Sequence, residues 1–413
     1  MNTISHQYAF IQIFRVCLLA FTGCNSNSDG KLVQKKPIIV SFSMKLRIYT
    51  LLTFLAVANF YHSAFSQINT GVIILDKQEQ TRFKKLIAQD PFVSGIYNSI
   101  KNKADAHLKL EPSPVKMIHY EGLLETNPKR VETVKSLLDA NKVLDLIYTG
   151  YGSSDAIYGE KIREIVLAWA DVYEPTGNPI NEHKFTSFFF GYHLNRDLFS
   201  VEEKQNVESW LSSMARKELE NRSVPNNNWQ AKRLKIIGTI GCIIQDEELK
   251  EYALTGLKKY ISTAYFPDGT SNDLKLRDAL HYHLGGIKPM LDIFINLSKF
   301  DPRFDLYEYT DSLGTSIKKA VEYTIPYISG EKIRKEWVNT KVELDKKRAA
   351  AGLAEYQPGK LFDPEDAIPM LNCAVYYNPD WFELICGCKK HFKCNFEALL
   401  NSPLLRQQNT CLP

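Results

Sequence analysis

The body of this sequence is poor in cysteine and in long apolar runs. Between residues 67 and 372 the only cysteine is Cys242, so no disulfide framework holds this region together. No stretch after residue 70 is apolar for 18 residues, which excludes a polytopic membrane protein. The sequence also lacks a Gly-rich phosphate loop, a G-x-S-x-G turn and an H-E-x-x-H helix. These absences exclude the commonest nucleotide-binding, serine hydrolase and zinc protease motifs.

Net charge is also nearly absent from the body, although the whole chain carries +4. Residues 1–66 contribute six basic side chains and one acidic side chain, so the remainder has 45 basic and 46 acidic residues, or −1. Such a chain has no overall field to attract nucleic acid or anionic lipid, and we expect no nucleic-acid partner. An anionic ligand therefore requires a local basic cluster.

Residues 1–66 are predicted to be a leader. Two basic residues follow Met44, an apolar segment covers residues 48–61, and Ala64-Phe65-Ser66 offers small residues for cleavage. This order is typical of a secretory signal. We therefore expect translation to start at Met44 and the protein to be exported, periplasmic or secreted, with no spanning helix in the mature chain. The alternative is a lipid anchor on Cys24, after an earlier apolar segment.

Residues 381–413 differ in composition from the body and are predicted to be an atypical tail. Five cysteines gather near the C-terminus: Cys373, Cys386, Cys388, Cys394 and Cys411. Around His391 the spacing is C-x-C-x2-H-x2-C, which is not a common structural zinc pattern. In an exported chain local disulfides are the better expectation. Cys242, inside an apolar helical pattern, is interpreted as a buried structural thiol.

The body follows a helical period. Between Leu249 and Ile261 apolar side chains recur at i, i+3 and i+4, and Asp246 is suited to cap this helix. Alternating strand patterns are scarce, connections are short, and no fixed repeat suggests a solenoid. We therefore predict an all-α fold, an incomplete (α/α) toroid of antiparallel helical hairpins over residues 67–380. Similar helical patterns occur near residues 80–103, 131–148, 156–173, 181–197, 201–219, 229–244, 280–299 and 312–326.

One polar segment, residues 225–233, precedes a strongly apolar helix. It contains three successive asparagines, Trp229, and the cations Lys232 and Arg233. A helix cap explains one asparagine but not three beside a tryptophan. Cations in a first helical turn are also poorly placed against the helix dipole. The segment is therefore a candidate binding or catalytic region.

A second polar segment runs from Asp268 to His283 and ends in the cluster His281-Tyr282-His283, with Arg277 just before it. A structural interpretation is a pair of hydrogen-bonded histidines at a helix start. Clustered titratable groups behind a polar turn instead favour a substrate-facing rim. A zinc site is the weaker interpretation, because His281 and His283 point to different sides of a helix. We predict no metal site.

These segments resemble signature motifs of the alginate lyase superfamily of polysaccharide lyases. The sequence R-D-A-L-H-Y-H after D-G-T-S carries the resemblance. The similarity covers about residues 85–380 in order. Three other segments resemble further motifs of this family: residues 225–233, Trp169 to Glu182, and Glu336 to Gly352.

The resemblance implies β-elimination on an anionic uronate polysaccharide such as alginate or glucuronan. The enzyme offsets the uronate carboxylate charge, a base removes the C5 proton, and an acid protonates the departing O4. Asn228 matches the family's neutralising asparagine, although Trp229 stands where one branch has a histidine. Arg277 suits bidentate pairing with a carboxylate. Amide and guanidinium donors make a cofactor unnecessary.

Several other residues are predicted to bind substrate. Lys232, Arg233 and Lys275 supply local positive charge that the neutral body lacks. The predicted substrate-binding set is Asn227, Trp229, Lys232, Arg233, Tyr192 and His193.

The sequence departs from the family at the catalytic base. Relatives commonly carry a tyrosine two residues after the second histidine, and Gly285 occupies that position here. His281 and Tyr282 share its helix face, four and three residues earlier, and either is a candidate base. His283, the family-matched second histidine, is predicted to donate to the substrate. Tyr192 and His193 are reserves.

Two other functions compete with the lyase. Loss of the tyrosine at position 285 is compatible with a non-catalytic polysaccharide-binding relative. A glycoside hydrolase on a similar toroid requires two carboxylates across a cleft, and the aspartates near residue 270 cluster in one segment. We favour the lyase. The polymer, endo or exo attack, and oligomeric state are not determined by the sequence.

Overall fold

The computed structural model describes residue 68 and residues 71–387, 396–402 and 405. The chain divides into two compact units, Met1–Ser66 and Gln67–Pro413. The predicted leader, including Met44 and Cys24, lies outside the described residues. So do Cys388, Cys394 and Cys411 in the tail.

The described part of the second unit is helical and contains no strand, only two isolated β-bridges. It is an (α/α) toroid, as the helical periodicity predicts. The long helices are α3 (Lys77–Gln89), α4 (Pro91–His107), α5 (Pro128–Gly152), α6 (Ile157–Val172), α8 (Thr186–Leu194), α9 (Val201–Glu220), α10 (Asn228–Ile244), α11 (Glu247–Ala264), α13 (Leu280–Leu297), α14 (Ile317–Ile328) and α15 (Glu343–Ala350). Short helices are α7 (Pro179–Glu182), η1 (His183–Phe185), α12 (Asn272–Arg277), α16 (Ile368–Ala374), α17 (Phe382–Gly387) and α18 (Phe396–Asn401).

Side-chain caps account for most of the helix starts. The predicted cap of α11 is confirmed, because the Asp246 carboxylate accepts a hydrogen bond from the Leu249 backbone N–H. The single helix expected over residues 80–103 is wrong, since the chain breaks between α3 and α4 at Asp90. Pro91 has no N–H and cannot continue α3, while the Asp90 carboxylate caps α4.

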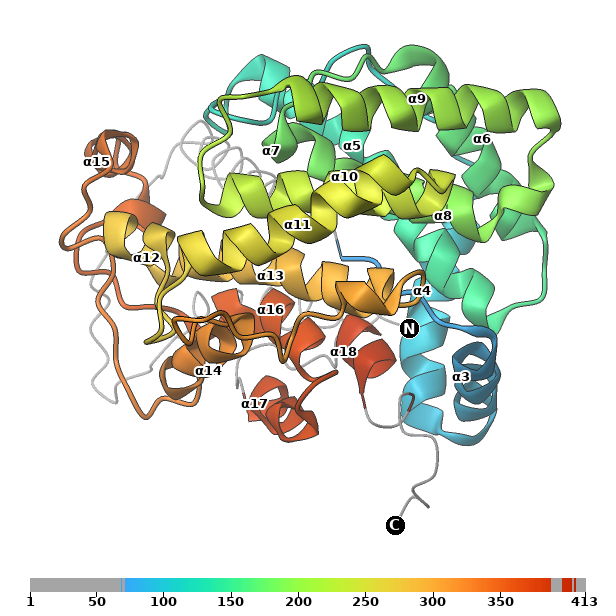
Figure 1. The fold of residues 1–413 in the computed structure, drawn as a ribbon. Helices are drawn as coiled ribbons and strands as arrows, with labels where there is room; N and C mark the ends of the chain where they lie inside the picture. The colour runs from blue at the N-terminus through green and yellow to red at the C-terminus, as the bar shows by residue number, and fades with distance from the viewer. Residues whose placement is uncertain (1–67, 69–70, 388–395, 403–404, 406–413) are drawn as a thin grey trace, which may run out of the picture. The chain divides into compact units, whose positions relative to one another are not determined.

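Helix α10 lies at the centre of the packing and contacts α7, α8, α9, α11 and α13. Its neighbours α11 and α13 run beside it in Figure 1. Two glycines allow α11 to approach closely. A Cβ at Gly238 would lie 3.2 Å from the Ala253 Cβ, and one at Gly241 would lie 3.0 Å from the Lys250 backbone nitrogen. The close approach fixes the inner face of α10 relative to the rest of the toroid.

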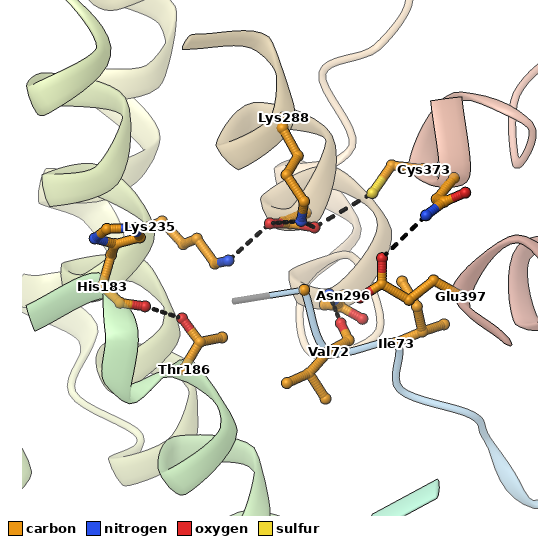
Figure 2. Close-up of polar contacts among 12 residues, drawn as sticks. Val72, Ile73, His183, Thr186, Lys235, Lys288, Asn296, Cys373 and Glu397 are labelled. Atoms are coloured by element: carbon orange, nitrogen blue, oxygen red, sulfur yellow. Dashed lines mark hydrogen bonds and ion pairs between the residues drawn. The ribbon is translucent and has the colours of Figure 1, made fainter. Parts of the chain in front are cut away.

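An extended segment, residues 71–75, lies inside the fold against α13 and α5. Val72 to Leu75 are all buried. The Asn296 side chain accepts from the Ile74 N–H at 2.9 Å and donates to the Val72 carbonyl at 2.6 Å (Figure 2). The Tyr148 hydroxyl donates to the Gly71 carbonyl at 3.2 Å. These side-chain hydrogen bonds satisfy backbone groups that a neighbouring strand would satisfy in a β-sheet.

The buried cysteines are unpaired thiols. Cys242 is 5% exposed and free, which confirms its interpretation as a structural thiol. Burial raises the pKa of Cys242 to about 12, so it is a poor nucleophile. Among the described helices, none is both long and apolar enough to span a bilayer.

Candidate active site

The start of α10 presents an unengaged amide. The Asn227 side chain caps the helix by accepting from the Trp229 N–H at 3.0 Å. The next residue, Asn228, donates its backbone N–H to the Asp273 carboxylate at 2.8 Å and is 5% exposed. Its side-chain amide has no hydrogen-bond partner among the described residues, so it can still bind a ligand. The three asparagines therefore have different roles. Asn227 caps the helix, Asn228 has an available side-chain amide, and Asn226 donates to the Thr263 hydroxyl.

Tyr282 lies between two guanidinium groups. The Arg277 guanidinium lies 3.8 Å from the centre of the Tyr282 ring, and Arg348 donates to the Tyr282 hydroxyl at 3.0 Å. Arg277 is held in place by an ion pair with Asp345 at 2.6 Å. The indole of Trp337 packs edge-on against the phenol at 5.8 Å. Tyr282 is therefore fixed in orientation and has positive charge at its ring face and its oxygen.

The segment that supplies Arg348 is anchored at the junction between α12 and α13. Asp278 adopts a left-handed conformation with φ 53°. Its carboxylate accepts from Arg334 at 2.6 Å and from the Asn339 backbone N–H at 2.9 Å. The Glu336 carboxylate caps α13 by accepting from the Leu280 N–H. These contacts hold the late motif from residue 336 against the histidine segment, more than fifty residues earlier.

His281 and Gly285 lie on the same face of α13, as predicted. His281 is half-buried, and burial lowers its pKa, partly opposed by the negative charges of Glu355 and Asp366. The imidazole is therefore largely neutral at pH 7. At Gly285, an added Cβ meets no atom within 4 Å. No neighbouring atom therefore requires a glycine at this position.

Two predicted site residues are engaged in the protein interior. Both ring nitrogens of His283 have partners, the Ser271 hydroxyl at 2.8 Å and the Ala320 carbonyl at 3.2 Å, and the side chain is fully buried. Arg233 donates to the backbone carbonyls of Glu218 and Leu219. Neither side chain is available to a substrate in this arrangement, and both fit a structural role.

The reserve pair on α8 also lies apart from this group. The Tyr192 hydroxyl donates to the Glu208 carboxylate at 2.6 Å. Burial and this hydrogen bond both raise the pKa of Tyr192. The His193 ring packs against Phe300 at 4.7 Å. These contacts place both side chains against α9 and the end of α13, so the structure does not bring them to Asn228 and Tyr282.

Sequence reasoning missed a set of cations on the inner faces of η1, α10 and α13. Lys235 and Lys288 both bind the Asp292 carboxylate, at 2.7 Å and 2.9 Å (Figure 2). Although burial opposes it, the two ammonium groups hold the pKa of Asp292 below its usual value. Lys184 in η1 is 8% exposed. The spacing of Lys232 and Lys235, three residues apart on α10, was the signal that could have identified the cluster.

No group of three or more His, Cys, Asp or Glu residues in the described part of the chain is arranged to bind a metal ion. Cys388, His391 and Cys394 lie outside that part, and so does the side chain of Cys386.

Comparisons with known proteins identify the family and the fold. The family model described as alginate lyase matches residues 89–334. No curated protein matches the chain. The fold is similar to the crystal structure of an alginate lyase from Bacteroides ovatus, with a TM-score of 0.59 and 17% identity, over 82% of this chain and 99% of that one. Alginate lyase A1-III from Sphingomonas species A1 has a TM-score of 0.44 and 17% identity, over 71% and 95% of the two chains.

Proposed function

Because the chain belongs to the alginate lyase family and is a polysaccharide lyase, we propose that it cleaves alginate or a related uronate polymer by β-elimination. The observation that carries this proposal is the position of Tyr282 between Arg277 and Arg348, linked by a chain of contacts to Asn228. The contacts run from Asn228 through Asp273 and Arg277 to the Tyr282 ring. A carboxylate neutraliser and a proton-transfer group are thus part of one contact network.

The proposed reaction needs only these side chains. The Asn228 amide and the neutral His281 ring donate hydrogen bonds to the uronate carboxylate, which makes the C5 proton easier to remove. The phenolate of Tyr282 takes that proton, and the C5–H electrons form the C4=C5 double bond as the C4–O4 bond breaks. The phenol then gives the proton to O4. No water is consumed, and Tyr282 ends as it began.

Arg277 has a different role from the one the sequence predicts. Its ion pair with Asp345 leaves its guanidinium against the Tyr282 ring instead of free to bind a carboxylate. We assign it to holding Tyr282 and to offsetting the charge of the phenolate. Arg348, on the hydroxyl oxygen, has the same task. A cation beside a developing or transient anion is worth most in a partly buried site such as this one.

The first experiment is ultraviolet absorbance of the purified protein with polymannuronate, polyguluronate and glucuronan in turn. A rise with one polymer reports the unsaturated product and identifies the substrate. Tyr282→Phe should abolish the rise, while His281→Gln should weaken it. Tyr252→Phe on α11, an exposed tyrosine, is the matched control. Binding without absorbance would support a non-catalytic relative, and new reducing ends without absorbance would support a hydrolase.

We also propose that the protein is exported, from the signal-like segment after Met44. N-terminal sequencing of the mature protein from the producing cell should begin at or near Gln67. A product that retains residues before Met44, or one lipidated at Cys24, would contradict this start site.

A further inference from the structure

Two lysines on separate elements have charged side chains without partners. Lys184 lies in η1 and Lys232 lies in α10, and these elements pack together. Lys184 is 8% exposed and Lys232 is half-buried. Neither ammonium group has a hydrogen-bond or ion-pair partner within the described residues. Lys184 Nζ instead lies 4.4 Å from the centre of the Tyr120 ring. Both nitrogens keep some solvent access, since neither is among the fully enclosed, unbonded polar atoms.

The surroundings of this pair are predominantly positive. The carboxylates nearby are already engaged: Asp292 binds Lys235 and Lys288, and Asp273 accepts from the Asn228 backbone. The negative charge of Glu397 raises the pKa of Lys288. The charged and titratable groups that face the two lysines are Arg130 from α5, His183 from η1, Lys235 from α10, Asp273 from α12, and His281 and Lys288 from α13.

Leaving two ammonium groups in this setting is unfavourable unless an anion joins them. Burial, followed by repulsion from Lys232, lowers the pKa of Lys184 to about 7. Burial also lowers the pKa of Lys232 to about 8, with Asp273 opposing and Lys235 adding to the effect. The neighbouring His183 is held neutral by burial and by the same cations. Near neutral pH the pair is therefore only partly protonated.

We propose that Lys184 and Lys232 form an anion subsite, which binds a uronate carboxylate next to the one held by Asn228. The geometry points to this position because Lys232 follows Asn228 by four residues, one turn along the same face of α10. The side chain of Lys184 approaches from η1. The inference rests on the proposed function for the identity of the anion, and it adds a second site of recognition to the reacting sugar.

Proton uptake follows from the charges. A bound carboxylate stabilises the protonated form of each lysine, so binding raises the pKa of both lysines and draws protons from the buffer. Well below pH 7 both lysines are already protonated, and the contribution of these two groups to affinity is then at its highest. As pH rises above 8, affinity should fall by up to about tenfold per pH unit for each lysine.

The test is calorimetric binding of a mannuronate tetrasaccharide to the Tyr282→Phe protein, in which the ligand stays uncut. Titrations at pH 7.5 in phosphate and in Tris, whose ionisation enthalpies differ, give the number of protons taken up. We expect net uptake, with reduced uptake and at least tenfold weaker binding after Lys184→Met or Lys232→Met. Lys184→Arg keeps the charge but cannot titrate, so it should keep the affinity and lose its share of the uptake.

Lys258→Met, an exposed lysine on α11, is the control and should match the parent. Unchanged proton uptake in both Lys→Met variants would overturn the subsite, and so would binding of a neutral glucose tetrasaccharide with equal affinity. Cleavage of polymer with no lysine-dependent uptake would refute the subsite alone. Lysine-dependent uptake without any absorbance change in the parent protein would refute the lyase mechanism and leave the anion subsite in place.

Discussion

At the scale of single residues, Arg348 determines the setting of Tyr282. Its side chain donates to the Tyr282 hydroxyl at 3.0 Å and lies 4.8 Å from the centre of the Tyr356 ring. This contact comes from residues far along the chain, in the segment that Asp278 and Glu336 anchor. The charge environment of Tyr282 thus comes partly from Arg277 in its own motif and partly from Arg348 in the late motif, 66 residues further along the chain.

Replacement of Arg348 tests this dependence. Arg348→Met should lower kcat by roughly 10- to 100-fold with little change in KM, because the phenolate loses a cation that acts during proton transfer. Arg348→Lys should recover part of the activity and shift the pH profile of kcat. Lys346→Met, on the exposed face of α15, is the control. A KM effect with unchanged kcat would show that Arg348 binds substrate instead.

The residues also show what sequence patterns can identify. Asn228, His281 and Tyr282 were proposed because amides, an imidazole and a phenol stand at unusual spacing, and their catalytic roles stay predictions. His283 and Arg233 were misplaced, because spacing gives the helix face but not what packs against it. His283 points to Ser271 and Ala320, and those contacts depend on the position of α14. Lys184 was missed because a single lysine within the helical pattern of residues 181–197 has no sequence signal of its own.

At the scale of elements, the linker between α6 and α7 gives a structural reason for the motif from Trp169 to Glu182, which local sequence patterns do not explain. The Glu182 carboxylate accepts hydrogen bonds from the backbone N–H groups of Thr176 and Gly177 and from the Tyr173 hydroxyl. Gly177 has φ 71° and packs against α9. The linker is thus held on Glu182 by hydrogen bonds. These bonds fix the position of α7 and of Lys184, which follows α7 in η1.

Gly177→Ala should destabilise the protein by about 2–3 kcal/mol, since the new methyl group overlaps the Lys217 carbonyl and the left-handed backbone disfavours a side chain. Urea unfolding measures the change. Gly330→Ala is the control, because Gly330 has φ 83° but no atom within 4 Å of its Cβ position. It should show only the backbone penalty, about 1 kcal/mol. If both variants lost the same free energy of unfolding, the structure would have relieved the overlap between the new methyl group and the Lys217 carbonyl.

Helix positions were predicted well, and helix interruptions were not. The start of α11 agrees with its predicted cap and that of α13 with apolar periodicity, whereas the break at Asp90 was missed although Pro91 marks it. The extended segment 71–75 was also outside the prediction, because its buried apolar residues find their partners more than seventy residues away. Local patterns report local structure, and this segment is specified by distant contacts.

At the scale of the whole molecule, a buried pair of acidic side chains ties stability to pH. Glu218 is fully buried, and burial together with the charge of Glu182 raises its pKa to about 9. The unfolded chain releases this proton near its ordinary value of 4.5, while the folded chain keeps it. Stability from this group is therefore complete below pH 4.5 and is lost progressively as pH rises to about 9.

Glu218→Gln removes this titration. The free energy of unfolding of the parent should decline between pH 5 and pH 9, and the variant should decline less and exceed the parent at pH 8. Urea titrations across the pH range measure both curves. Glu220→Gln, an exposed residue two positions along α9, should follow the parent. Parallel curves for Glu218→Gln and the parent would show that Glu218 is ionised in the folded state.

The toroid fold was predictable from the sequence. The contacts that join its N-terminal and C-terminal segments were not. Helical periodicity and short connections are enough to indicate antiparallel hairpins, and the family motifs follow their order. The packing of α18 on α16 and the route of residues 71–75 through the interior depend on which side chains meet across the whole chain. No pattern within a window of twenty residues contains that information.

The route of residues 71–75 also has a consequence for the order in which the protein is made. Their partner Asn296 is synthesised more than two hundred residues later, and Arg82 bonds the Leu405 carbonyl 323 residues further on. Residues 72–75 therefore leave the ribosome long before Asn296 is made, and this part of the core closes only after residue 405 has been synthesised. The region matched by the family model ends at residue 334. A chain stopped there contains Asn228, His281 and Tyr282 but lacks the cation on the Tyr282 hydroxyl and the carbonyl that Arg82 binds.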